Sequence, residues 1–323
     1  MKYSLFVPVF LFGATIICQA AEPVQQTVQF RSLPTEKQVP DLFRMENQDF
    51  SVKLQIKREL PISKIAVGEI EYPSAVKSPY EVNNTVYGEY FRPLGKGPHP
   101  AVIVLDILNG DGSISRTIAQ MLAQNGVAGL YVHMAYYGPR RPKTEKVRLL
   151  STDIVLTKAA IQQTVKDIRL ATAWLQSQPE IDPKRVGIHG TSLGSFIAAL
   201  SSAADPRLSR VSLLLGGGGL VDAFWKHPQA APYIKQLEDN GITKAYVKEQ
   251  VAPLDPITYA ERLGKRDLLM LAASKDDIVP PSASQMLWEA TGKQKIIWYE
   301  ATHVGAAMHL FSVLPEILKH HKK

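Results

Sequence analysis

Thiols are almost absent from this chain, and their absence restricts its chemistry. Among 323 residues there is one cysteine, Cys18. It lies within residues 1–20, which have the pattern of a secretory signal peptide, so the mature chain from Ala21 onward is expected to lack cysteine. A disulfide, a cysteine nucleophile and a cysteine-bound zinc ion are therefore not expected.

Long hydrophobic runs and basic stripes are scarce as well. The apolar run at residues 5–17 is too short to span a bilayer comfortably. Lys2 precedes it and Ala20 follows it, which predicts cleavage after Ala20 and export to the periplasm or the medium, without membrane insertion. The net charge of +7 arises from 37 basic and 30 acidic residues spread along the chain. Without a basic stripe and interleaved aromatic residues, nucleic acid is not an expected partner.

The first part of the mature chain changes from irregular to strand-like. Residues 21–48 are polar and contain proline, and we interpret them as an N-terminal arm before a domain at 49–323. Three segments then alternate apolar and polar residues, as half-buried antiparallel strands do: 50–60, 64–72 and 83–93. Residues 101–107 are continuously apolar, which is typical of a strand covered on both faces.

From that strand onward, helical and strand-like segments alternate. Helices are expected at 115–124, at 154–176, from 193 and at the C-terminus, and strands at 127–133, 185–189, 211–215, 268–273 and 295–299. This alternation predicts an α/β fold with a mostly parallel, doubly wound sheet and antiparallel N-terminal strands. The helical, proline-punctuated segment 220–263 is expected to form a small cap over it.

The sequence Gly190-Thr191-Ser192-Leu193-Gly194 stands between a predicted strand and a predicted helix. A serine on so sharp a turn needs neighbours without side chains two positions away on either side. The turn would raise the Ser192 hydroxyl above the sheet and direct the helix N-terminus towards it, which favours developing negative charge. Ser192 is therefore the candidate nucleophile.

A serine hydroxyl needs a base, and the base needs an orienting group. In the order expected on this scaffold the acid precedes the histidine. Asp276 and Asp277 follow one predicted strand and His303 follows the next, where ligand sites of open sheets lie. We expect His303 to be the base and Asp276 the acid, with Asp277 as the alternative.

These segments resemble the α/β-hydrolase superfamily, and more narrowly its dienelactone-hydrolase, acetyl-xylan-esterase and prolyl-oligopeptidase-like branch. The resemblance runs from about residue 72 to the C-terminus, through "YFRPLGKGPHPAVIVL", "RVGIHGTSLG", "ASKDDIVPP" and "ATHVG". It implies a hydrolase fold with a Ser-His-Asp triad. Where the family usually has His-Gly after the first buried strand, this chain has Asp106-Ile107, which leaves one oxyanion donor undetermined.

The neighbouring loops supply the other candidate site residues. One oxyanion donor is expected to be the backbone N–H of Leu193, and the second that of Ile107 or Leu108. We expect Asp106 to turn into hydrogen bonds of its own loop, away from the oxyanion. Candidate substrate-binding side chains are Asn109, Tyr136, Tyr137, Arg140 and Arg141; a rigid loop with solvated arginines is the alternative for the last four.

The sequence therefore predicts an exported serine hydrolase without cofactor or metal, a monomer or homodimer. It is expected to cleave small or carbohydrate-linked carboxylic esters through an acyl-enzyme. A prolyl-oligopeptidase-like peptidase and a non-catalytic binding protein on the same fold remain as alternatives.

Overall fold

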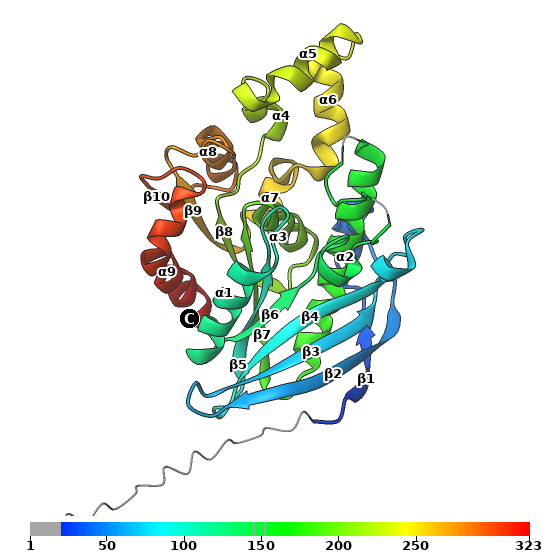
Figure 1. The fold of residues 1–323 in the computed structure, drawn as a ribbon, viewed down its shortest axis with the longest axis vertical. Helices are drawn as coiled ribbons and strands as arrows, with labels where there is room; N and C mark the ends of the chain where they lie inside the picture. Colours follow the sequence, from blue (N-terminus) through cyan, green and yellow to red (C-terminus); the bar gives the residue numbers. More distant parts are fainter. Residues whose placement is uncertain (1–20, 145, 152) are drawn as a thin grey trace, which may run out of the picture.

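Ten strands of the described chain form one sheet (Figure 1). The computed structural model describes residues 21–323 except 145 and 152, so the predicted signal peptide at 1–20 lies outside the described residues. The strands are β1 Val24–Phe30, β2 Gln48–Leu60, β3 Ile65–Pro73, β4 Thr85–Pro93, β5 His99–Leu105, β6 Ala128–Val132, β7 Ile181–Thr191, β8 Leu208–Leu214, β9 Asp267–Ala273 and β10 Lys295–Tyr299. Their order across the sheet is β1-β2-β3-β4-β6-β5-β7-β8-β9-β10.

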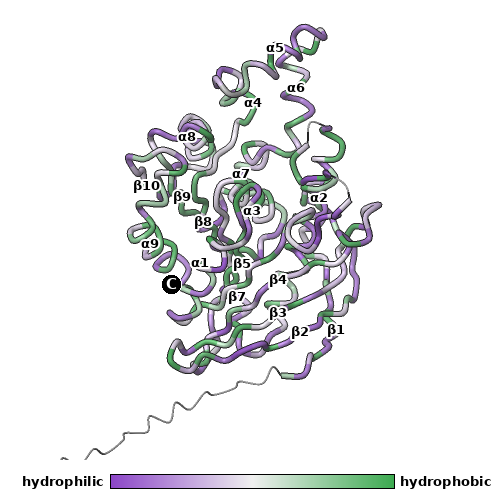
Figure 2. The backbone as a smooth tube through the Cα atoms, viewed as in Figure 1, coloured by the Kyte–Doolittle hydropathy of each residue, from purple (hydrophilic) through white to green (hydrophobic). Residues whose placement is uncertain are grey.

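The sheet has an antiparallel part and a parallel part. Strands β1 to β4 pair antiparallel with one another, and β4 pairs antiparallel with β6. From β6 to β10 every pairing is parallel. Figure 2 shows the inner strands as hydrophobic, whereas the outer strand β2 alternates between hydrophobic and hydrophilic residues. The predicted fold class, a mostly parallel sheet with antiparallel N-terminal strands, is confirmed.

Helices cover both faces of the parallel part. The α-helices of the described chain are α1 Ser113–Gln124, α2 Ile154–Ser177, α3 Leu193–Ala204, α4 Leu220–Phe224, α5 Ala231–Asp239, α6 Lys244–Val251, α7 Ala260–Leu263, α8 Pro281–Ala290 and α9 Leu310–Lys322, of which α1, α2, α3 and α9 pack on the sheet. One core lies between the sheet and α2 with α3, around the fully buried Trp174. A second core lies on the other face, where α1 contributes Ile118 and α9 contributes Ile317. The inner parallel strands are thus largely buried on both sides, as their continuous apolar sequences require, whereas the edge strand β10 is only partly buried.

The N-terminal segment is more ordered than the sequence indicated. Residues 24–30 pair with β2 as the edge strand of the sheet, in register from Val24 with Leu54 to Phe30 with Gln48. Phe30, Val39 and Phe43 are completely buried. The interpretation of 21–48 as an arm outside the domain is therefore wrong, because Val28, Phe30, Val39, Phe43 and Met45 enter the main core.

The segment Leu220–Leu263 is helical and includes α4 to α7. Helices α4, α5 and α6 stand beyond the carboxyl ends of the parallel strands, at the top of Figure 1. We call α4 to α6 the cap. No helix within residues 21–323, the two undescribed positions aside, is long and apolar enough to cross a membrane.

A buried histidine chain links β7, β8 and the C-terminal helix. The Ser212 hydroxyl lies 2.8 Å from Nδ1 of His189 and 2.8 Å from Nε2 of His321. Burial lowers the pKa of His189 to about 3 and also lowers that of His321. Both imidazoles are therefore neutral in the folded protein at neutral pH.

This burial predicts an acid-sensitive fold. An unfolded histidine has a pKa near 6.5, so between about pH 6.5 and pH 3 the unfolded chain binds a proton that folded His189 excludes. The free energy of unfolding should therefore decrease as the pH falls through this range, by up to about 1.4 kcal/mol per pH unit for each such group. In chemical denaturation at pH 7, 6 and 5, His189→Asn should show a flatter pH dependence than the wild type. Parallel curves would contradict this account.

Candidate active site

The serine turn between β7 and α3 has the geometry that its sequence predicts. Ser192 has φ 52° and ψ −117°, an unfavourable conformation for a residue with a side chain. A Cβ atom on Gly190 would lie 2.0 Å from the carbonyl oxygen of Gly194, and a Cβ atom on Gly194 would lie 2.6 Å from that of Leu105. Only glycine fits at these two positions, so the turn depends on both.

Three side chains from different loops form one hydrogen-bonded series. Nε2 of His303 lies 2.9 Å from the Ser192 hydroxyl, and Nδ1 lies 2.8 and 2.9 Å from the two carboxylate oxygens of Asp276. Ser192 directly follows β7, Asp276 follows β9 and His303 follows β10. The carboxyl ends of these parallel strands lie at one edge of the sheet, which brings the three loops together.

The two aspartates after β9 contact different atoms of His303. Asp276 is buried and also accepts hydrogen bonds from the backbone N–H groups of Ile278 and Val279. These bonds fix the carboxylate that faces the imidazole. Asp277 instead accepts a hydrogen bond of 3.2 Å from the backbone N–H of His303. Of the two candidates, the structure thus brings Asp276 to the imidazole ring and Asp277 to the backbone beside it.

The loop after β5 carries the candidate oxyanion donors. The Asp106 carboxylate accepts hydrogen bonds from the backbone N–H of Gly112 at 2.7 Å and from the Ser115 hydroxyl at 3.1 Å, so it turns into its own loop as expected. Leu108 lines the same cavity as Ser192 and Leu193. Leu193 is the first residue of α3, where backbone N–H groups lack partners within the helix.

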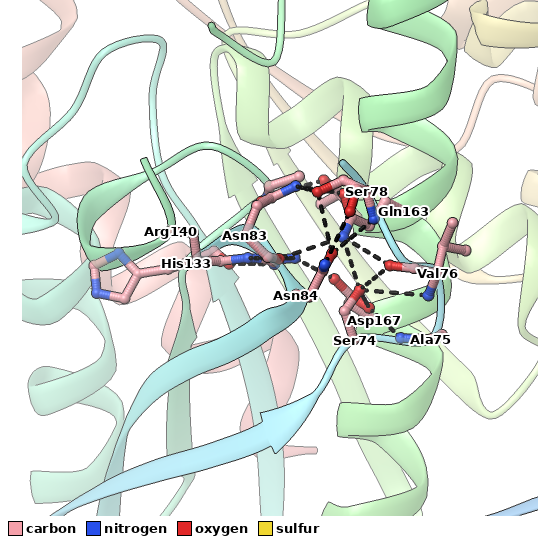
Figure 3. A network of polar contacts seen from close by, with 12 residues as sticks. Ser74, Ala75, Val76, Ser78, Asn83, Asn84, His133, Arg140, Gln163 and Asp167 are labelled. Carbon is pink, nitrogen blue, oxygen red and sulfur yellow. Dashed lines mark hydrogen bonds and ion pairs between the residues drawn. The ribbon is translucent and has the colours of Figure 1, made fainter. Parts of the chain in front are cut away.

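Arg140 lies in a buried polar network (Figure 3). It does not line the cavity beside Ser192. It has no exposed surface, and its guanidinium donates to the Asp167 carboxylate at 2.7 Å and to the backbone oxygens of Asn83 and His133. Asp167 in turn accepts hydrogen bonds from the Ser74 hydroxyl and the Ala75 backbone. Every side of the guanidinium is used within the fold, so the expectation that Arg140 binds substrate is wrong.

The two tyrosines of this loop are also buried. The Tyr136 backbone N–H donates to the side chain of Asn83, and its ring packs edge-on against Tyr80. The Tyr137 hydroxyl accepts a hydrogen bond of 3.0 Å from the backbone N–H of Asn109. Neither ring lines the cavity beside Ser192, so the structure gives both tyrosines a packing role.

Asn109 and Arg141 are exposed residues of the loops after β5 and β6, respectively. The side-chain oxygen of Asn109 accepts a hydrogen bond of 2.7 Å from Arg148, and Asn109 has φ 56°. Arg141 is exposed, donates to the backbone oxygen of Tyr136, and lies over the ring of Tyr137. Neither side chain lines the cavity beside Ser192.

Other histidines are held apart from Ser192. His133 lies against Tyr131, and burial lowers its pKa to about 4. His189 belongs to the buried chain under α9. Among the described residues, no group of three or more His, Cys, Asp or Glu side chains is arranged to hold a metal ion.

A cavity of about 490 Å³ opens beside Ser192 and extends under the cap. Its walls come from α2, α3, the cap helices and the loops that carry Leu108 and Ile278. Sequence reasoning missed the cap residues on this wall, among them Phe224, Trp225 and Ile234. The signal available was amphipathicity in short helices, which does not reveal what the apolar side of a helix faces.

The sheet order and the serine turn at its carboxyl edge are those of the α/β-hydrolase fold. The family model of the prolyl oligopeptidase family matches residues 155–313, and that of alpha/beta hydrolase domain containing 18 matches residues 82–217. About half of the chain thus resembles the prolyl oligopeptidase family, in line with the resemblance that its motifs indicated.

Solved structures share the fold at low sequence identity. The acetyl xylan esterase of Paenibacillus sp. R4 superposes with a TM-score of 0.66 at 19% identity, covering 88% of this chain and 90% of that one. Acetyl xylan esterase 1 of Thermoanaerobacterium sp. JW/SL YS485 gives 0.62 at 18% identity, covering 82% and 87%.

Sequence relatives include two uncharacterized proteins of Mycobacterium tuberculosis. Rv2627c is 25% identical over 171 residues, which are 52% of this chain and 40% of that protein. Rv2307c is 26% identical over 212 residues, which are 64% of this chain and 63% of that protein. The chain thus spans less than two thirds of either relative's length.

The network in Figure 3 predicts that Arg140 stabilises the fold. Arg140→Gln would leave the buried Asp167 carboxylate without its cation, a loss that typically costs about 3–5 kcal/mol. We expect a decrease of that order in the free energy of unfolding, measured by chemical denaturation. Arg141→Gln, its exposed neighbour, is the matched control and should change stability little. An unchanged stability in Arg140→Gln, with a fall in kcat/KM alone, would contradict this role.

Proposed function

We propose that this protein is a serine carboxylesterase whose triad is Ser192, His303 and Asp276. The observation that carries the proposal is the continuous hydrogen-bond series from Asp276 through His303 to Ser192 at the serine turn. If the Nδ1 proton of His303 is donated to Asp276, the Nε2 lone pair faces the serine hydroxyl and accepts its proton.

The reaction then follows from these positions. Ser192 Oγ attacks the ester carbonyl carbon while His303 removes its proton, and the Leu193 N–H stabilises the oxyanion together with a second donor from Ile107 or Leu108. The tetrahedral intermediate collapses, the alkoxide leaving group receives the proton from His303, and an acyl-Ser192 ester remains. A water molecule, deprotonated by His303, hydrolyses this ester and restores the serine.

The esterase proposal gains support from the names of the structural neighbours, two of which are acetyl xylan esterases. We propose export of the mature chain from residue 21 and cleavage of small or carbohydrate-linked esters. No cofactor is required, because the serine, the imidazole and backbone donors perform every step.

A peptidase is a second candidate, favoured by the match of residues 155–313 to the prolyl oligopeptidase family. Hydrolysis of p-nitrophenyl acetate without hydrolysis of peptide p-nitroanilides would separate the esterase from the peptidase.

Ligand binding that survives Ser192→Ala, with no turnover by the native protein, would instead indicate a binding protein.

The proposed triad makes distinct predictions for the two aspartates. Ser192→Ala, His303→Ala and Asp276→Asn should each lower kcat with p-nitrophenyl acetate by about 10³-fold or more, because each breaks the proton path. Asp277→Asn is the matched control and should cost far less, since Asp277 accepts a hydrogen bond from the backbone N–H of His303, whereas Asp276 faces Nδ1 of the imidazole.

A fluorophosphonate probe gives an independent readout of the same serine. We expect an adduct on the peptide that contains Ser192 in the folded protein, and none after heat denaturation or in His303→Ala. Labelling that is equal in the wild type and His303→Ala would show that the imidazole does not activate the serine. Peptide mapping by mass spectrometry locates the adduct.

A further inference from the structure

The wall of the cavity beside Ser192 is almost entirely hydrocarbon. Of the described residues that line it, none is charged, and the hydroxyl-bearing ones are Ser192 and Thr157. The Thr157 hydroxyl already donates to the backbone oxygen of Ser151 and accepts from its N–H. A sugar buried here would lose hydrogen bonds to water without replacement, which is unfavourable. The cavity therefore suits an apolar group.

The cavity is also extended away from the serine. Near Ser192 its wall consists of α3 residues such as Leu193 and Ile197, whereas at the other end it consists of Ile234 on α5 and Val247 on α6. In Figure 1 these cap helices stand at the top of the molecule, well beyond α3. A space that runs from the nucleophile into the cap can accommodate a chain, and an acetyl group would leave most of it unfilled.

The position of His303 decides which half of an ester enters. Nε2 of His303 must protonate the leaving oxygen, so the alcohol lies on the histidine side of Ser192. Of the described cavity residues, none comes from the segment 299–309 that carries His303, whereas Leu108 and Leu193 come from the candidate oxyanion side. The acyl half, opposite the leaving group, is therefore the half directed into the cavity.

We infer that the cavity under the cap is an acyl-chain site, and that the preferred substrates are esters of medium-length or longer aliphatic acids. This inference rests on the proposed esterase activity and narrows its substrate: carbohydrate-linked esters stay within it, whereas small esters such as acetates become the poorer substrates. The carbohydrate or other polar part of an ester then belongs outside the cavity, as the alcohol. Burial of each additional methylene group in such a site favours binding by up to about four-fold.

A chain-length series tests the inference. We expect kcat/KM to rise at least tenfold from p-nitrophenyl acetate to the octanoate, measured below the solubility limit of each ester. An acetate rate equal to or above the octanoate rate would overturn the acyl-chain site while leaving the esterase proposal intact. Failure to cleave any ester, together with no fluorophosphonate adduct on Ser192, would instead overturn the esterase proposal.

Two adjacent cap residues provide a matched pair of variants. Ile234 lines the cavity, whereas Tyr233 is 63% exposed and does not. Ile234→Glu places a carboxylate at the far end of the cavity and should lower the octanoate-to-acetate ratio of kcat/KM at least tenfold. Tyr233→Glu introduces the same charge into the same helix and should retain the wild-type ratio. Equal shifts in both variants would overturn the inference.

Direct binding provides a readout that needs no turnover. Trp225 lines the cavity, so its fluorescence reports occupancy in Ser192→Ala, with Trp225→Phe in the same background as the spectral control. Decanoate should bind at least tenfold more tightly than butyrate, and Ile234→Glu should remove that difference. Equal affinities for the two acids would overturn the acyl-chain site.

Discussion

The close backbone approach at the serine turn is the constraint on which the rest of the site depends. Ser192 has a positive φ in a sparsely populated backbone region, which costs about 1–3 kcal/mol, and the surrounding core must hold it there. Its backbone N–H donates to Leu214 on the neighbouring strand, and its backbone oxygen accepts from both the N–H and the hydroxyl of Ser195. The hydroxyl of Ser195 in turn leaves room only for glycine at position 216. The strain is thus distributed over two strands and a helix, which explains why three separate glycines surround one serine.

Parallel strand geometry supplies the other two members of the series. Asp276 and His303 follow adjacent parallel strands, β9 and β10, whose register places their carboxyl ends together. The hydrogen bonds from Ile278 and Val279 then hold the Asp276 carboxylate towards the imidazole. Backbone N–H groups thus position the carboxylate and the carboxylate positions the imidazole, so the reacting groups need little reorganisation when an ester binds.

The sequence was enough to predict features that depend on neighbouring residues, such as the serine turn. It was not enough to predict which charged side chains are buried and paired with a distant residue. Short-range patterns predicted the glycines of the serine turn, the strand-end positions of Asp276 and His303, and the parallel sheet. Arg140 and Arg141 are adjacent and look alike in sequence, yet one is completely buried and the other is exposed. What separates them is Asp167, 27 residues further along, which faces Arg140 from α2. In the same way, edge-strand pairing by residues 24–30 depends on a partner that no local pattern identifies.

The two sides of the active site differ in how they are built. At the loop of Arg140, a buried ion pair and several hydrogen bonds join the segment before β4, the loop after β6 and α2. Over the cavity, the cap contributes apolar side chains from short helices, and α5 and α6 bury none of their residues completely. Changes to the cap alter the shape of the cavity without touching Ser192, His303 or Asp276, whose hydrogen-bonded supports lie in the strands, their adjoining turns and the start of α3. Substrate choice can therefore change on this fold while the geometry of the serine, imidazole and carboxylate stays fixed.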